Sequence, residues 1–131
     1  MPVTHVTVSS LAEFDAALSA ALSSGAPAFS FFSGALNEDG VSWCPDCEEF
    51  KPLLKAVIEE AGAAGDLTLI TAPLVRSEYK GVATHWARVH PKVMLRAIPT
   101  FIKWGASKKV AELVDPECKD VASVRTLVLD E

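Results

Sequence analysis

Two cysteines three residues apart stand where an apolar run gives way to a helix, and this feature constrains the fold more than any other. The run, Ala28 to Phe32, is continuous except for one serine, as expected of a strand covered on both faces. The motif Trp43-Cys44-Pro45-Asp46-Cys47 opens the next predicted helix, since proline is well placed in a first helical turn. The two cysteines can close and reopen a disulfide, which predicts thiol–disulfide exchange.

The whole chain, residues 1–131, predicts one domain, because its length and its half-apolar composition suffice for one buried core. The elements are expected in the order β, α, β, α, β, α, β, β, α. The predicted strands are 3–8, 28–32, 66–71, 100–104 and 109–114, the last two joined at Gly105-Ala106-Ser107, and the predicted helices are 11–24, 45–61, 79–93 and one from about 116. Residues 73–79 are predicted to be irregular. The third helix is expected to bury Val82, Trp86 and Val89, and the last helix Val121, Val124 and Leu127 or Val128.

Charge and cysteine usage narrow the class of protein. A net charge of −5 and a pI near 5.2 argue against nucleic acid or an anionic membrane as the main partner, because clustered Lys and Arg bind both. No apolar stretch is long enough to span a bilayer, and no targeting segment is recognisable at the start. One CxxC pair plus a solitary Cys118 is not the framework of a secreted disulfide-stapled domain, so we expect a cytoplasmic protein with a working dithiol.

Competing interpretations of the cysteine pair are weaker. Half of a zinc site would need two more ligands, and the candidates Cys118, His5, His85 and His90 form no second pair at the usual spacing, so no metal is expected. Covalent haem attachment would need a histidine directly after Cys47. A fold with incidental cysteines is a third alternative. We read Trp86, Trp104, Met94 and the phenylalanines as core, and Cys118 as a buried or inert thiol.

The motif and its surroundings resemble the thioredoxin superfamily, and specifically its WCPDC branch of cytosolic thioredoxin-like proteins. Further matches are the strand 29–32, Pro52 in the helix, and Ile98-Pro99-Thr100 before another strand. The resemblance implies an α/β thioredoxin fold, with a central mixed β-sheet flanked by helices. It also implies a cis peptide bond at Pro99, facing the cysteines, and an Ile98 backbone that pairs with an extended substrate segment.

The position of each cysteine predicts its role. Cys44 lies at or next to the helix N-terminus, where free N–H groups stabilise a thiolate, so we assign it as the nucleophile. Cys47, one turn further in, is expected to be less exposed and to resolve the mixed disulfide. Trp43 is expected to cover the disulfide.

Two departures from ordinary thioredoxins follow from the same residues. The motif carries Pro45-Asp46 between its cysteines, and Glu48 and Glu49 follow, so the site is predicted to be unusually acidic and selective against acidic partners. The buried acid that thioredoxins carry on the central strand has no counterpart, Ser30 being the only polar candidate there. Asp46 is a candidate substitute base for the resolving thiol, directly or through water, and the alternative is a plain carboxylate of the kind favoured in a first helical turn.

The resemblance also implies partners. An NADPH-dependent flavoprotein thioredoxin reductase would recycle the Cys44–Cys47 disulfide, and the substrates would be cystine, other small disulfides, and selected oxidised or nitrosylated proteins. No bound cofactor other than the redox-active disulfide is expected, and we expect a monomer. A redox-regulated adaptor with the same fold and little turnover is the alternative.

Overall fold

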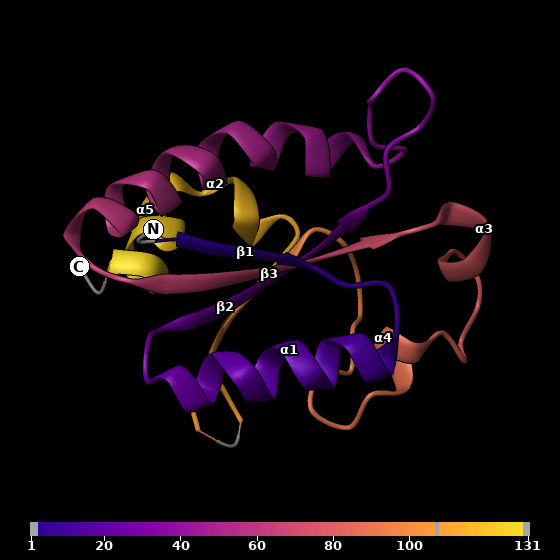
Figure 1. The fold of residues 1–131 in the computed structure, drawn as a ribbon. Helices are drawn as coiled ribbons and strands as arrows, with labels where there is room; N and C mark the ends of the chain where they lie inside the picture. The colour runs from indigo at the N-terminus through magenta and orange to yellow at the C-terminus, as the bar shows by residue number, and fades with distance from the viewer. Residues whose placement is uncertain (1–2, 107, 130–131) are drawn as a thin grey trace.

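A five-stranded sheet separates two layers of helices in the computed structural model, which describes residues 3–106 and 108–129 (Figure 1). The strands are β1 (Val3–Thr7), β2 (Ala28–Gly34), β3 (Leu67–Leu74), β4 (Thr100–Trp104) and β5 (Lys109–Val114). The helices are α1 (Leu11–Ser24), α2 (Pro45–Ala64), α3 (Arg76–Tyr79), α4 (Trp86–Val89) and α5 (Val121–Leu129), with a 3-10 turn η1 (Glu117–Lys119) before α5.

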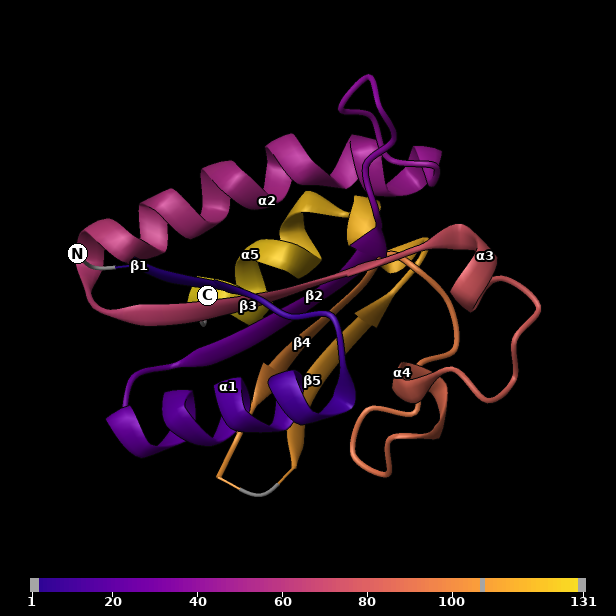
Figure 2. The same cartoon turned by 45° about the vertical axis from the view of Figure 1, so that its right-hand side comes forward.

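The sheet is mixed, in the order β1-β3-β2-β4-β5. β1 and β2 run parallel to β3, whereas β4 is antiparallel to β2 and β5 is antiparallel to β4. Helices α2 and α5 cover one face, and α1 and α4 lie on the other (Figures 1 and 2). This architecture confirms the predicted mixed sheet flanked by helices.

The central strand β2 explains why both faces need a helix layer. All seven of its residues are buried, and their side chains alternate between two cores. Phe29 and Phe31 pack with the α2 and α5 layer, whereas Phe32 packs with Phe14 of α1. A buried aromatic side chain of this kind contributes about 1.5–3 kcal/mol, so the two helix layers hold the strand that leads to the cysteines.

The predicted helix 79–93 is wrong, since only α4 within it is helical, and the short α3 precedes it. Gly81 adopts a left-handed φ of 76°, which interrupts any helix between them. Pro91 then holds the preceding residue extended, so α4 ends at Val89. Val89 and Met94 are 55% and 60% exposed, contrary to their predicted burial.

Further boundaries differ from the sequence prediction. Strand β2 runs to Gly34 and helix α2 to Ala64, where ends at residues 32 and 61 were expected. Strand β3 continues through Pro73 to Leu74, where an irregular segment was expected. Proline is tolerated there because β3 no longer pairs with β1 past Thr71, so that edge of the strand needs no N–H donor. The last helix starts at Val121, which is half exposed, because the extended Asp120 separates it from η1. Leu127 and Val128 are both buried. The predicted turn residue Ser107 lies outside the described residues.

Candidate redox-active site

The turn before the cysteines is fixed by Ser42, a residue that the sequence did not single out. Its buried hydroxyl donates a hydrogen bond to Gly34 O at 2.8 Å and accepts one from Cys44 N at 3.1 Å. Gly34 allows this close approach, because a Cβ there would lie 2.6 Å from Ser42 Oγ and 3.0 Å from Cys44 Cβ. The Ser42 hydroxyl thus links the end of β2 to the start of α2, and the absence of a side chain at Gly34 leaves the space for this contact.

Helix α2 begins at the cysteine pair as predicted. Cys44 is the N-cap, Pro45 is the first helical residue, and the Cys47 backbone N–H points at Cys44 Sγ, with N and Sγ 3.3 Å apart. A disulfide joins the two cysteines, whose Cα atoms are 5.2 Å apart. Cys44 is 6% exposed and Cys47 is not exposed at all, so Cys44 is the sulfur that a partner can reach. Even Cys44 is more buried than the exposed nucleophile that the sequence suggested.

A proline loop faces the pair from the other side of the site. The Ile98–Pro99 peptide bond is cis, as the resemblance implied. Cys44 Sγ lies 3.9 Å from the carbonyl oxygen of Ile98, a distance at which a reduced thiol can hydrogen-bond to it. The loop is anchored by Thr100, whose hydroxyl donates to Ala97 O at 2.6 Å. The fold therefore brings together two segments that are 54 residues apart in sequence.

Trp43 binds the neighbouring end of β3. Its indole N–H donates to Leu74 O at 2.7 Å, and its ring lies 6.4 Å from that of Tyr79, measured between centroids. These contacts fix the residue next to Cys44 against the α3 segment. That the Trp43 ring covers the disulfide stays a prediction.

The carboxylates near the pair are matched by lysines, which the sequence analysis did not foresee. Asp46 lies 2.8 Å and Glu49 3.4 Å from Lys119 Nζ, and Glu48 pairs with Lys51 at 2.6 Å. The Lys119 ammonium is the largest cause of the lowered pKa of Asp46. The predicted acidic rim is therefore partly neutralised, because a residue distant in sequence supplies its counter-charge.

Ser30, one of the two serines of the central strand β2, is already engaged. Its buried hydroxyl accepts the indole N–H of Trp104 at 2.8 Å. The sequence analysis missed the carboxyl group of Asp115, which lies beside that of Asp46. The sequence around Asp115 does not mark it as a site residue, because its neighbours Val114 and Pro116 indicate only the end of a strand.

Cys118 has the properties predicted for an inert thiol. It is fully buried, and its Sγ is 3.4 Å from Leu113 O and 3.6 Å from Pro99 O. Burial raises the pKa of this thiol to about 12, so the nucleophilic thiolate does not form near neutrality.

His85 and His90 have structural partners. His90 Nε2 lies 2.7 Å from Asp15 Oδ1, and His85 Nδ1 accepts the Ala87 N–H at 3.1 Å. Among residues 3–106 and 108–129, no cluster of three or more His, Cys, Asp or Glu side chains could hold a metal ion. Within the same ranges, no helix is both long enough and apolar enough to cross a membrane.

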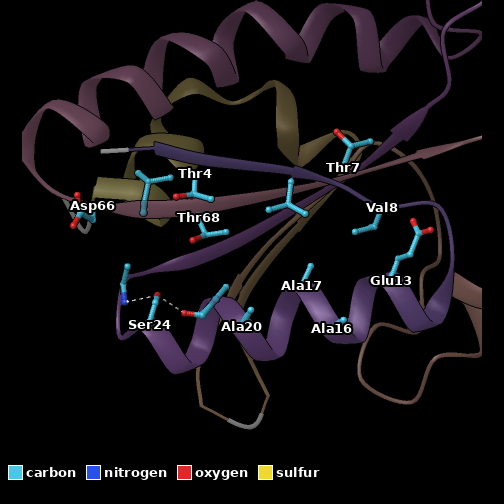
Figure 3. Close-up of a pocket in the computed structure, with 14 residues that line it drawn as sticks. Thr4, Thr7, Val8, Glu13, Ala16, Ala17, Ala20, Ser24, Asp66 and Thr68 are labelled. Atoms are coloured by element: carbon cyan, nitrogen blue, oxygen red, sulfur yellow. Dashed lines mark hydrogen bonds between the residues drawn. The ribbon is translucent and has the colours of Figure 1, made fainter. Parts of the chain in front are cut away.

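A hollow of about 700 Å³ lies on the opposite layer, between β1 and α1 (Figure 3). Small side chains shape it, Ala17 and Ala20 from α1 facing Thr4 and Thr68 from the sheet. Its lining includes neither cysteine of the pair, so the reactive sulfur lies outside it.

Thiol oxidoreductases of the thioredoxin fold are the class that this sheet and this cysteine pair define. Oxidised thioredoxin O2 from Arabidopsis thaliana superposes with a TM-score of 0.66 at 23% identity, covering 99% of this chain and 96% of that one, which shows the fold. The family model for the thioredoxin domain of thioredoxin domain-containing protein 17-like proteins matches residues 7–130. The chain belongs to this family.

Two relatives of this family align with the chain over most of their length. The chain is 31% identical to thioredoxin domain-containing protein 17 of Mus musculus over 114 residues, which is 87% of this chain and 85% of the mouse protein. It is 28% identical to the Homo sapiens protein of the same name over 127 residues, which is 97% of this chain and 96% of that protein.

Proposed function

We propose that this protein is a cytoplasmic disulfide reductase in which Cys44 attacks a substrate disulfide and Cys47 resolves the product. The observation that carries the proposal is the position of Cys44 as the N-cap of α2, with the Cys47 N–H directed at its sulfur. Free N–H groups at a helix start stabilise negative charge, and a thiolate is the nucleophile in disulfide exchange.

The reaction takes two steps at one sulfur. The Cys44 thiolate attacks one sulfur of the substrate, forms a mixed disulfide and expels the first substrate thiolate. Cys47 then loses its proton and attacks Cys44 Sγ, which closes the protein disulfide and expels the second thiolate. The complete burial of Cys47 suits this second step, because an outside disulfide reaches Cys44 first.

Substrate binding is proposed at the cis-proline loop. The backbone of Ile98, a partly buried residue of this loop, would pair with an extended segment carrying the disulfide. Candidate substrates are cystine, other small disulfides, and selected oxidised or nitrosylated proteins. Recycling by an NADPH-dependent thioredoxin reductase would complete the cycle.

Turnover and trapping test the proposal together. NADPH consumption with thioredoxin reductase is measured on cystine and on insulin side by side, and many equivalents reduced per protein are expected; an adaptor would reduce about one. Cys47→Ser should accumulate a mixed disulfide through Cys44, and Cys44→Ser should be inert. Cys118→Ser is the matched control and should turn over like the wild type. Turnover by Cys44→Ser would refute the assignment.

A further inference from the structure

The second step leaves a proton without an obvious acceptor. Cys47 is fully buried, where an ionised sulfur would lack solvation by water, so its proton needs a base. Strand β2 offers no carboxyl group, because its polar side chains are the two serines Ser30 and Ser33, and Ser30 already accepts a hydrogen bond from Trp104. Asp46 is a weak base, because its ion pair with Lys119 lowers its pKa.

Asp115 reaches the site from the end of β5. Its backbone N–H donates to Pro99 O at 3.0 Å, which ties it to the loop that faces Cys44. Its carboxyl group adjoins that of Asp46, the residue directly before Cys47. Asp115 thus contacts both the cis-proline loop, through Pro99, and the start of α2, through Asp46, which are the two segments that meet at the cysteine pair.

The Asp115 carboxyl group is unsatisfied as an anion. Its Oδ1 atom is buried and no donor of the described residues reaches it. Two carboxyl groups can hydrogen-bond only when one of them carries a proton, so the Asp46–Asp115 contact is complete once Asp115 is protonated. An acceptor whose protonated form is better bonded than its anion is suited to take up a proton.

We propose that Asp115 accepts the proton of the Cys47 thiol during resolution, in place of the acid that is absent from β2. The inference rests on the proposed reductase function. The Cys47 S–H bond breaks and its proton moves to the Asp115 carboxylate. Cys47 Sγ then bonds to Cys44 Sγ, the bond between Cys44 and the substrate breaks, and the departing sulfur keeps that electron pair. The proton passes from Asp115 to the departing thiolate, so only the substrate disulfide is reduced.

The charges around Asp115 support the direction of transfer. Burial, followed by the neighbouring Asp46 carboxyl group, raises the pKa of Asp115, and Glu49 adds to this while Lys119 opposes it. A further titratable neighbour, Cys118, stays neutral near pH 7 because burial raises the pKa of its thiol. The pKa values of the two carboxyl groups are therefore displaced in opposite directions. Asp46, with the lowered pKa, stays ionised, and Asp115, with the raised pKa, is the group that takes up and releases the proton.

Resolution can be followed without a reductase or a physiological substrate. Reduced protein is mixed with dithiobis(nitrobenzoate), and release of the second coloured thiolate, which is independent of reagent concentration, reports the attack by Cys47. For Asp115→Asn this phase should be at least about ten-fold slower than the wild type at neutral pH. The two rates should converge as the pH rises well above the ordinary thiol pKa of about 8.5, where even a buried thiol ionises without a base.

The controls separate the possible failures. Glu49→Gln removes a carboxylate that is 64% exposed and also meets Lys119, and it should keep the wild-type profile. Asp115→Glu should restore much of the rate, and equal urea midpoints verify that the variants are folded. Equal rates for Asp115→Asn and the wild type, or slowing by the same factor at every pH, would overturn the role of Asp115. Failure of the wild type to release a second thiolate would instead overturn the proposed function.

Discussion

Removing the Ser42 hydroxyl is expected to destabilise the turn that carries the cysteines. Ser42→Ala leaves two buried backbone groups, Gly34 O and Cys44 N, without the partner that now lies 2.8 Å and 3.1 Å away. An orphaned buried polar group costs about 1–3 kcal/mol, and a value near the low end for each gives a loss of about 2 kcal/mol. With an unfolding entropy of about 2.1 cal/mol/K for each of 131 residues, this lowers Tm by about 7 °C.

Urea unfolding of the oxidised protein, followed by circular dichroism, measures this loss. The midpoint should fall at constant m-value, because the extent of unfolding is unchanged. Ser23→Ala, at an exposed position of α1, is the matched control and should stay within about 0.5 kcal/mol of the wild type. A Ser42→Ala loss no larger than that of the control would show that water or a small shift replaces both hydrogen bonds, and the anchoring role would be refuted.

Three other outcomes follow from the site and its surroundings. Gly34→Ala should lose about 1–3 kcal/mol in the same urea assay, since its Cβ would lie 2.6 Å from Ser42 Oγ, whereas Gly65→Ala, with open space around its Cβ, should not; similar losses would contradict the close packing. Cys118, with a pKa raised from 9.0 to about 12, contributes stability that is complete below pH 9 and is lost as the pH rises toward 12. The urea midpoint should therefore fall over that range in the oxidised wild type, and less in Cys118→Ala; identical slopes would count against it. Asp46→Asn should shift the iodoacetamide alkylation profile of Cys44 slightly to lower pH, because it removes an anion near the thiolate; an unmoved profile would leave Asp46 a plain helix-start residue.

Local patterns were sufficient for the long elements. The apolar run of β2 and the Cys-Pro start of α2 depend on burial and on helix-start chemistry, which act within a few residues, so both elements were predicted to start where they start in the structure, although β2 runs two and α2 three residues further than predicted. The segment between β3 and β4 was predicted wrongly, because the spacing of its apolar residues is that of a helix whereas Gly81 and Pro91 interrupt helical structure there. Local spacing cannot decide between these when both signals occupy the same fifteen residues.

The sequence by itself determined the cysteine pair, the helix that begins at it and, through resemblance, the fold and the cis bond at Pro99. Only the tertiary structure decided what surrounds the sulfurs. Lys119 neutralises Asp46, and Asp115 adjoins it, because the β4–β5 hairpin returns the chain to the start of α2. Charge and proton affinity depend on distance in space, and contacts between groups about 70 residues apart leave no periodic trace in a single sequence.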